Sequence, residues 1–469
     1  MKRTPAKPAE VIEQPELSHG LATESGLPVY PPTGLRVAVV GGGFVGLVAA
    51  AGFAQFGHTV SLVEKDSQKL DEMRAGKVRI YERGLPELIT ANLRRQRLSF
   101  RADLAEAVKG AQAIFLAVGT PSLSSGEADL SAVFEVIENL IPLLEPRQII
   151  VLKSTVPVGT ASQVRNLLFR NGAEKKQIAV VSNPEFLREG TAVLDFFRPQ
   201  RIVIGGDRPE AIETVAQLYR VGMMDACPIV VTNNETAEMI KYASNLFLAT
   251  KVTFTNELAN LCDAAGINVT EVTRGMGLDS RISPEFLSPG PGFGGSCLPK
   301  DLEAILNLAQ KHGTQLSIAE AVKEANRRQP DKVVEKLESL LGNLKGKTIG
   351  ILGLTFKAHT NDLRSSPALE VMKRLVAKGA LLQAFDPVAE AKTLWPELKL
   401  APKPEEVAEG AHGLVVLTEW PEFMALDWEA VGGRMKAKNI VDARNLLVPE
   451  ILTRHGFNYL GMGQKPGEV

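Results

Sequence analysis

The stretch "GFGGSCLPKD", residues 292–301, places Cys297 between a glycine-rich run and a Lys-Asp pair. The small residues before the cysteine would leave its side chain accessible, and Lys300 would favour the thiolate, which is the reactive form. An accessible thiolate can attack an electrophilic carbon and form a covalent intermediate. We therefore predict that Cys297 is a nucleophile.

Two further motifs place polar side chains where they can act together. In "AEMIKYASN", Lys241 and Asn245 are four residues apart, so on a helix they would project from one face and could converge on one oxygen. In "NPEFLREG", Glu185 and Glu189 follow the strand-like run "QIAVVS", where active sites of open α/β sheets lie. The alternatives are a solvated helix face for the first pair and surface acids at a helix start for the second.

The other two cysteines, Cys227 and Cys262, have no activating neighbour in the sequence. We predict that both are small buried side chains. A total of three cysteines is odd and too small for a disulfide framework, which is typical of a reducing compartment. We predict no metal site.

A glycine-rich turn follows the first strand-like run of the chain. In "RVAVVGGGFVGLVAA", Gly41, Gly43 and Gly46 have the G-x-G-x-x-G spacing of a turn that cradles a pyrophosphate. Glu64 ends the next strand-like run about 20 residues later, where a carboxylate would bind the adenosine ribose and repel a 2′-phosphate. The sequence thus predicts NAD rather than NADP. The alternative is that the glycines only pack a helix on a sheet.

A cysteine nucleophile beside a dinucleotide site supports a particular chemistry. The thiolate can trap an aldehyde as a thiohemiacetal, a second oxidation gives a thioester, and water then releases an acid. These steps need a donor for the developing oxyanion and a base or positioned water. We therefore expect an oxidation to an acid that reduces two nicotinamides.

The elements that must hold these residues alternate along the chain. From residue 36, short β-branched runs alternate with helix-length segments, and the alternation resumes at "KTIGILGL" after a long helical pattern between residues 234 and 268. This predicts two Rossmann-like, doubly wound parallel-sheet α/β domains joined by a long central helix. The expected parts are a flexible lead-in (1–33), an NAD-binding domain (34–233), a central helical region (234–330) and a second Rossmann-like domain (331–469).

The composition excludes several classes of protein. With 53 basic and 54 acidic side chains, nothing indicates attraction to nucleic acid or to a membrane surface. The sequence contains no apolar run of the roughly 18 residues that a membrane span needs. We therefore expect a cytoplasmic protein with no nucleic-acid or membrane partner.

Long motifs occur in a fixed order along the chain: "GGGFVGL", "AVGTPS", "STVPVGT", "NPEFLREGTA", "AEMIKYASNLFLA", "GLDSRI", "GFGGSCLPKD", "GLTFKAHTNDLRSSPALE" and "FDP". In this series the chain resembles the nucleotide-sugar 6-dehydrogenases, the UDP-glucose/GDP-mannose dehydrogenase family. The resemblance implies NAD-dependent, four-electron oxidation of UDP-glucose at C6 to UDP-glucuronate through a covalent cysteine intermediate, a reaction of polysaccharide biosynthesis. It also implies that residues 234–330 form a dimerisation region and that residues 331–469 bind the UDP part of the nucleotide sugar. The implied homodimer has Arg281 crossing to the partner's substrate.

The same resemblance implies roles for individual residues. The implied catalytic residues are Cys297, Lys241, Asn245, Asp301, Glu185 and Thr155. The implied cofactor-binding residues are Gly41, Gly43, Phe44, Val45, Gly46, Glu64, Lys69, Thr120, Thr155, Glu189, Lys300 and Arg364. The implied substrate-binding residues are Glu185, Phe186, Leu187, Lys241, Asn245, Arg281, Phe286, Phe293, Gly294, Lys357 and Arg444.

Two positions depart from the family pattern. Gln200, in "RPQRI", stands where the family often has an aspartate, and Leu298 follows the cysteine where many UDP-glucose enzymes have an aromatic residue. The alternatives that stay open are the same mechanism on GDP-mannose, UDP-N-acetylmannosamine or UDP-N-acetylglucosamine. A non-catalytic sensor of NAD or a nucleotide sugar on the same fold is a further alternative.

Overall fold

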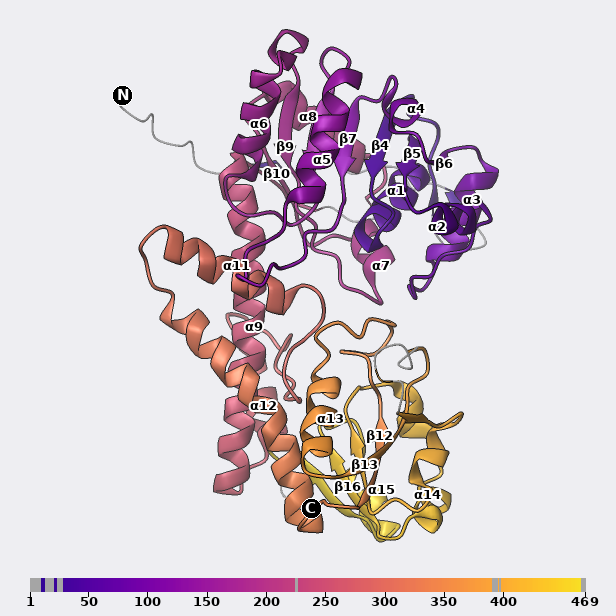
Figure 1. Cartoon of the computed structure of the whole chain (residues 1–469), viewed down its shortest axis with the longest axis vertical. Coiled ribbons are helices and arrows are strands. Elements are labelled where there is room, and N and C mark those ends of the chain that lie inside the picture. The colour runs from indigo at the N-terminus through magenta and orange to yellow at the C-terminus, as the bar shows by residue number, and fades with distance from the viewer. Residues whose placement is uncertain are drawn as a thin grey trace. The chain divides into compact units, whose positions relative to one another are not determined.

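The computed structural model describes residues 10–12, 21–22, 28–223, 227–389, 395 and 398–464. The chain divides after Ala243 into two compact units, which are described one at a time (Figure 1). Most of the predicted flexible lead-in, residues 1–33, lies outside the described residues. Its described parts include the short strands β1 (Glu10–Ile12), β2 (Leu21–Ala22) and β3 (Pro28–Val29).

The first unit is built on one large sheet. In spatial order, its described strands are β1, β11 (Ile229–Thr232), β10 (Ile202–Gly205), β9 (Ala179–Ser182), β8 (Ile149–Leu152), β7 (Ala113–Leu116), β4 (Arg36–Val40), β5 (Thr59–Val63) and β6 (Leu98–Arg101). The six strands from β9 to β6 are parallel and have the strand order of a doubly wound dinucleotide-binding sheet. This confirms the predicted fold class.

One part of the strand prediction needs correction. The run "RIVIGG" forms β10, which is antiparallel to β9, with Gly205 opposite Ser182, and β11 runs parallel to β10. The segment between β9 and β10 contains only the six-residue helix α7 (Ala192–Phe197). The chain therefore returns beside β9 in the opposite direction, without the helical crossover of a parallel neighbour.

Helices cover both faces of this sheet. They are α1 (Phe44–Gln55), α2 (Ser67–Arg74), α3 (Leu85–Arg94), α4 (Leu104–Val108), α5 (Ser131–Leu140), α6 (Thr160–Arg170), α7 and α8 (Pro209–Arg220). Alternate residues of β4 enter opposite cores: Val37 and Val39 pack with α1, whereas Ala38 and Val40 pack with α5 and α6. Such a strand is buried on both faces, which explains its continuous apolar sequence.

The second unit contains another doubly wound sheet. In spatial order, its described strands are β14 (Lys399–Leu400), β13 (Leu381–Phe385), β12 (Thr348–Leu352), β15 (Gly413–Val416), β16 (Asn439–Asp442) and β17 (Asn458–Gly461), and all are parallel. The helices that pack on this sheet include α13 (Pro367–Ala377), α14 (Trp428–Arg434) and α15 (Pro449–Arg454). The predicted second Rossmann-like domain is therefore present.

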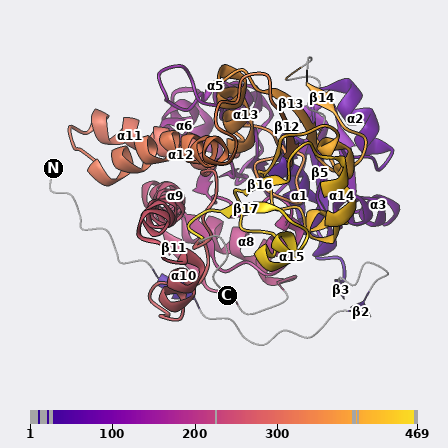
Figure 2. The ribbon, with the colours of Figure 1, turned by 90° about the horizontal axis from the view of Figure 1, so that it is seen from below.

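The long central helix is also present. Helix α9 (Asn234–Ala265) begins in the first unit and continues into the second, where α10 (Val269–Gly277), α11 (Leu298–Lys311) and α12 (Ser317–Leu341) follow. Helices α9 and α12 lie side by side in Figure 1 and Figure 2. Asn260 donates a hydrogen bond to Gln329 across this contact (3.0 Å), and Lys336 pairs with Asp263 (2.7 Å).

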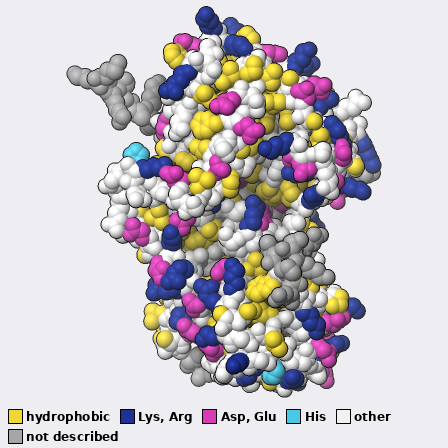
Figure 3. Space-filling view, in the orientation of Figure 1, with side chains coloured by type: hydrophobic (Ala, Val, Ile, Leu, Met, Phe, Trp, Pro, Cys, Tyr) yellow, Lys and Arg dark blue, Asp and Glu magenta, His cyan; other side chains and the backbone are white. Residues whose placement is uncertain are grey.

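Charged side chains of both signs are intermingled on the surface shown in Figure 3. This agrees with the near-zero net charge of the sequence. Among the described residues, no helix combines the length and the apolar character that a membrane crossing requires.

Candidate active site

The first turn of the first unit has the shape that a pyrophosphate needs. Gly41 has a φ of +108°, and a Cβ there would lie 2.5 Å from the carbonyl oxygen of Ala117. A Cβ on Gly46 would lie 1.9 Å from the carbonyl oxygen of Gly41, whereas one on Gly43 would meet open space. Gly43 is the N-cap of α1, so the open side of the turn faces the positive end of the helix dipole. These residues fit an NAD pyrophosphate.

Glu64 follows β5, at the predicted adenosine end of this site. Its carboxylate accepts hydrogen bonds from Lys69 Nζ (2.8 Å) and from the Asp66 N–H (3.0 Å). Partial burial acts to raise the pKa of Glu64, but these hydrogen bonds outweigh it, so the pKa lies below its ordinary value. A carboxylate held ionised here can accept hydrogen bonds from ribose hydroxyls.

The other expected cofactor residues of this unit lie at the same carboxyl edge of the sheet. Phe44 and Val45 form the first turn of α1. Thr120, after β7, donates to the carbonyl oxygen of Thr155, after β8 (2.8 Å), and thereby ties two neighbouring loops together. Glu189 is half-buried in the loop after β9.

A buried ion pair follows β9. Glu185 and Lys241 Nζ are 3.2 Å apart, and both side chains are almost completely buried. The Glu185 carboxylate also accepts the N–H of Leu187 (2.6 Å). The ring of Phe186 lies 5.3 Å from Lys241 Nζ and 3.6 Å from the guanidinium of Arg201. An acid and an ammonium held together away from water can move a proton or stabilise an anion.

A second buried lysine lies behind this pair, and the sequence reasoning missed it. Lys153 donates to Asn183 Oδ1 (3.1 Å) and to the hydroxyl of Tyr219 (3.0 Å), which are neutral partners. Burial lowers the pKa of Lys153 to about 7, opposed by the nearby charge of Glu185 and assisted by that of Lys241. The available signal was a lysine directly after the apolar strand "IIVL".

In the second unit, the carboxylate of Asp301 joins a predicted catalytic residue, Asn245, to a predicted cofactor-binding residue, Lys300. Asp301 is 1% exposed; it accepts a hydrogen bond from Asn245 Nδ2 (2.6 Å) and pairs with Lys300 Nζ (2.5 Å). Asn245 comes from α9, and the other two lie in the first turn of α11. The carboxylate therefore orients the Asn245 amide and holds the lysine beside the start of α11.

Cys297 is the N-cap residue of α11, where the helix dipole favours a negative charge. Its side chain is partly exposed, and its sulfur lies 3.7 Å from Ser296 Oγ. Phe293 and Gly294, in the loop before it, are buried. This setting suits a thiolate nucleophile.

The two other cysteines differ from Cys297. Both Cys227 and Cys262 are buried, as predicted. Burial raises the pKa of Cys227 to about 11 and also raises the pKa of Cys262. Their thiols therefore stay protonated at neutral pH.

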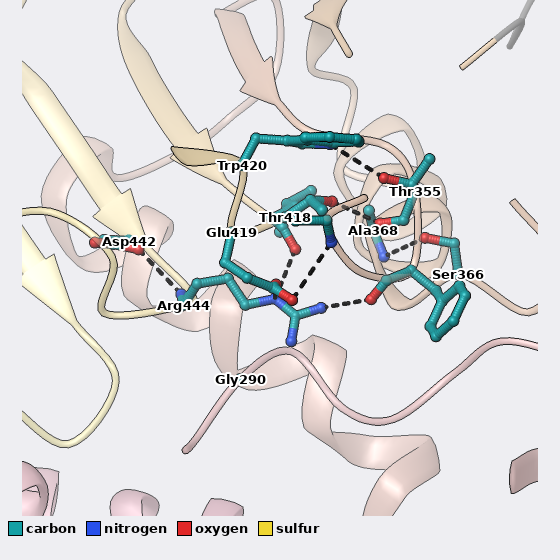
Figure 4. Close-up of polar contacts among 12 residues, drawn as sticks. Gly290, Thr355, Ser366, Ala368, Thr418, Glu419, Trp420, Asp442 and Arg444 are labelled. Atoms are coloured by element: carbon teal, nitrogen blue, oxygen red, sulfur yellow. Dashed lines mark hydrogen bonds and ion pairs between the residues drawn. The ribbon is translucent and has the colours of Figure 1, made fainter. Parts of the chain in front are cut away.

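At the carboxyl edge of the C-terminal sheet, Arg444 spans three loops. Its guanidinium donates to the carbonyl oxygens of Leu417 and Phe356 (both 2.9 Å) and pairs with Glu419 (3.1 Å). Figure 4 shows this side chain between Glu419 and the backbone at Gly290. Lys357 follows Phe356 in the chain, and its Nζ lies 5.8 Å from the centre of the Phe356 ring. Two cations are thus held where nucleotides bind doubly wound sheets.

The loop that carries Arg444 is organised by Asp442. This buried carboxylate accepts the N–H groups of Arg444 (3.0 Å) and Leu447 (2.7 Å) and the hydroxyl of Tyr459 (3.3 Å). Burial raises the pKa of Asp442 to about 6. The residue fixes the backbone from which Arg444 projects.

Three other expected site residues of the second unit have local features of their own. The Arg281 side chain is 87% exposed and pairs with Asp279 (2.6 Å). Arg364 pairs in the same way with Asp362 (2.7 Å). Phe286 has a φ of +62°, an uncommon conformation for a large side chain.

Within each unit, the structure therefore gathers a subset of the predicted residues. The first unit holds the pair Glu185–Lys241 and the glycine turn, and the second holds the chain Asn245–Asp301–Lys300. Lys241 and Asn245 lie one turn apart on α9, which is continuous between them.

Comparison with known proteins gives a consistent result along the chain. Three models of the UDP-glucose/GDP-mannose dehydrogenase family match: the NAD binding domain at residues 35–222, the central domain at 235–328 and the UDP binding domain at 350–449.

Individual proteins agree with these family matches. The UDP-glucose 6-dehydrogenase of Rhizobium meliloti is 42% identical over 436 residues, which cover 92% of this chain and 100% of that protein. The enzyme of the same name from Pseudomonas aeruginosa is 42% identical over 442 residues, covering 92% and 98%. The structure of a UDP-glucose dehydrogenase from Pyrobaculum islandicum superposes with a TM-score of 0.83 at 35% identity, covering 95% and 100% of the two chains.

Proposed function

Because the chain belongs to the UDP-glucose/GDP-mannose dehydrogenase family, we propose that it oxidises UDP-glucose at C6 to UDP-glucuronate. The reaction consumes two NAD⁺ and one water for each sugar nucleotide and releases two NADH and three protons. The observation that carries the mechanism is Cys297 at the N-terminus of α11, beside the buried Asp301. When bound, NAD accepts the hydride that each of the two oxidations removes from C6.

The chain's own residues hold the cofactor. Gly41, Gly43 and Gly46 form the turn for its pyrophosphate, and Glu64 binds the adenosine ribose, with Lys69 beside it. The other residues that we propose for cofactor binding are Phe44, Val45, Thr120, Thr155, Glu189, Lys300 and Arg364.

The first oxidation turns the C6 alcohol into an aldehyde. We assign the alcohol proton to Glu185, acting through a water that Thr155 holds, because Glu185 is a buried acid paired with Lys241. The Cys297 thiolate then attacks the aldehyde carbon and forms a C–S bond. Lys241 and Asn245 donate to the resulting oxyanion, which the four-residue spacing on α9 permits.

The second oxidation converts this thiohemiacetal to a thioester. Water attacks the thioester carbon, the C–S bond breaks, and the thiolate of Cys297 is regenerated with the carboxylate product. Asp301 holds Asn245 and Lys300 in place through this sequence, since its two oxygens bind one each.

The C-terminal domain supplies the nucleotide contacts in this proposal. Arg444 and Lys357 are the cations for the diphosphate. The residues that we propose to surround the sugar are Phe186, Leu187, Phe286, Phe293 and Gly294. We place the enzyme in the cytoplasm.

We further propose a homodimer built on α9. Phe247, Phe254 and Leu261 repeat every seventh residue on this helix and are 65%, 50% and 63% exposed. Such a seam is typical of a helix that packs against another helix. Arg281, exposed in the same unit, would reach the partner's substrate.

The direct test measures NADH formed for each sugar nucleotide consumed. The panel contains UDP-glucose, UDP-N-acetylmannosamine, UDP-N-acetylglucosamine and GDP-mannose. Two NADH per UDP-glucose are expected. If two NADH form only with another sugar nucleotide, that compound is the substrate and the mechanism stands. If no NADH forms with any of the four, the protein is a non-catalytic sensor.

The covalent mechanism has its own control. Cys297→Ser should lower acid formation by about 1000-fold or more, since a serine hydroxyl stays protonated at neutral pH and is a weak nucleophile. Cys262→Ser, at a buried cysteine, is the matched variant and should retain activity. Full two-step oxidation by Cys297→Ser would exclude the thioester route.

A further inference from the structure

The loop that leads to Cys297 is held by an amide on α12. The N–H of Phe293 donates to Asn326 Oδ1 (2.8 Å), and Asn326 Nδ2 donates back to the carbonyl oxygen of Phe293 (3.1 Å). One side chain thus satisfies both backbone polar groups of one loop residue. This two-point contact sets the orientation of the peptide as well as its position.

Two further side-chain amides, on α9 and α12, hold the same loop three residues earlier. The N–H of Gly290 donates to Asn256 Oδ1 on α9 (2.7 Å), and its carbonyl oxygen accepts from Gln329 Nε2 on α12 (3.0 Å). Asn260, also on α9, donates to Gln329 Oε1 (3.0 Å) and thereby orients the amide. Gln329 is 3% exposed and Asn256 2% exposed, so water does not compete for these bonds.

The opposite side of the loop is in close contact with the C-terminal sheet domain. A Cβ on Gly294 would lie 2.2 Å from the carbonyl oxygen of Ser365. A Cβ on Gly290 would lie 3.0 Å from Arg444 Nη1, the contact visible in Figure 4. The loop is therefore confined between the amides of α9 and α12 on one side and the turns after β12 and β16 on the other.

We propose that Asn326 and Gln329 are positioning residues that fix residues 290–297 and so aim the Cys297 thiol at the C6 aldehyde. The proposal rests on the function proposed above. Gly290 and Phe293 precede the nucleophile by only a few residues, and Gln329 and Asn326 of α12 bind their backbone groups. A displacement of a reacting group by roughly 1 Å can cost about 100-fold in rate.

A purely structural role for these amides predicts a different outcome. Loss of α9–α12 packing would weaken cofactor and substrate binding and slow both oxidations alike. Loss of thiol positioning slows only the step that needs the thiol, because the first oxidation, from alcohol to aldehyde, makes no bond to Cys297. The two steps can be separated, since the aldehyde is trapped by semicarbazide.

The experiment compares Asn326→Ala, Asn326→Asp, Gln329→Ala and the wild type. Arg327→Ala is the matched control on the same helix, because the Arg327 side chain is 65% exposed and pairs with Glu324 one turn away. Each protein is given the C6 alcohol or the C6 aldehyde of UDP-glucose. The rate of each oxidation, the KM and the yield of trapped aldehyde are measured, together with the melting temperature.

For Asn326→Ala we expect oxidation of the aldehyde to fall about 100-fold and oxidation of the alcohol by less than about fivefold. Trapped aldehyde should appear, and NADH per sugar should fall from two toward one. Asn326→Asp should lie between, because its carboxylate accepts from the Phe293 N–H but donates nothing to the Phe293 carbonyl. Gln329→Ala should show the same selective loss of aldehyde oxidation as Asn326→Ala. Arg327→Ala should have the rates of the wild type.

An independent readout is hydrogen exchange of the loop. Exchange of the Phe293 amide should be faster in Asn326→Ala, while the amides of β12 and β15 stay protected. Equal losses in both oxidation steps, or unchanged rates, would overturn the positioning role while the function stands. A wild type that makes no NADH from any nucleotide sugar would instead refute the function, and with it this role.

Discussion

At the scale of single residues, the chemistry is concentrated in polar side chains that are removed from water. Lys153 is the extreme case, because its ammonium is buried and its hydrogen-bond partners, Asn183 and Tyr219, are neutral. The charge of Glu185 acts to raise its pKa, and that of Lys241 acts to lower it. A buried lysine with neutral partners gives up its proton easily.

This environment predicts a pH-dependent contribution to stability. The pKa of Lys153 is lowered from 10.5 to about 7, so between these values the unfolded chain carries a proton that the folded chain lacks. Stability therefore rises with pH across this window, and the rise is absent from Lys153→Met. The free energy of unfolding of wild type, measured relative to that of Lys153→Met, should increase by up to about 3 kcal/mol between pH 7 and pH 9.

Urea unfolding at pH 6, 7, 8 and 9 would measure this difference. Lys65→Met, at an exposed position of the same unit, is the control variant. A free-energy difference between Lys153→Met and wild type that stays constant over this range would contradict the assignment.

At the scale of elements, α9 also organises the start of α6. Glu238 on α9 accepts the N–H of Gly159 (2.7 Å) and the N–H of Ala161 (2.9 Å). A side chain of one helix thus caps the N-terminus of another, α6. Burial raises the pKa of Glu238 to about 7, although these backbone bonds oppose the shift. The carboxyl group thus joins the loop after β8, which carries Thr155, to the central helix.

Removal of this cap should destabilise the protein. Glu238→Ala leaves two buried N–H groups without their acceptor, and we expect a loss of about 1–3 kcal/mol at pH 5. Because the folded pKa is raised from 4.5 to about 7, the contribution of the carboxyl group is complete below pH 4.5 and decreases as the pH rises through 7.

The effect of Glu238→Ala should therefore be smaller at pH 8 than at pH 5. Thermal unfolding at the two pH values measures it, with Glu235→Ala, a neighbouring glutamate whose side chain is 42% exposed, as the control. A larger loss at pH 8 than at pH 5 would be inconsistent with the raised pKa.

At the scale of the whole molecule, the proposed dimer makes each site depend on two chains. If Arg281 acts in the partner's site, then in a mixed dimer the defects of Arg281→Ala and Cys297→Ser fall in the same site and leave the other site intact. A site with an intact Cys297 then receives an intact Arg281 from the Cys297→Ser chain. Random mixing gives half mixed dimers with one working site each, or about a quarter of wild-type activity.

The measurement is NADH formation after the two inactive variants are unfolded together and refolded. Each variant refolded alone should stay inactive, and Phe254→Asp, which places a charge in the exposed seam of α9, should abolish the recovery. No recovery in the mixture, with dimers present, would place Arg281 in its own subunit's site.

The sequence by itself determined the features that depend on neighbours along the chain. The apolar runs and their spacing predicted two doubly wound sheets and the central helix, because burial repeats with the period of the element. The glycine turn and Glu64 were predicted for the same reason, since a tight turn between strand and helix leaves little freedom in residue type.

Only the tertiary structure decided which distant polar groups meet. Phe293 and Asn326 are 33 residues apart, and Lys153 and Tyr219 are 66 apart, so no local pattern pairs them. The reversal of β10 is of the same kind, because an apolar strand has the same sequence signature in either direction. Hydrogen bonds between distant residues depend on how the elements pack. These bonds reveal the buried setting of Lys153 and the contacts of Asn326 and Gln329 with the loop before Cys297.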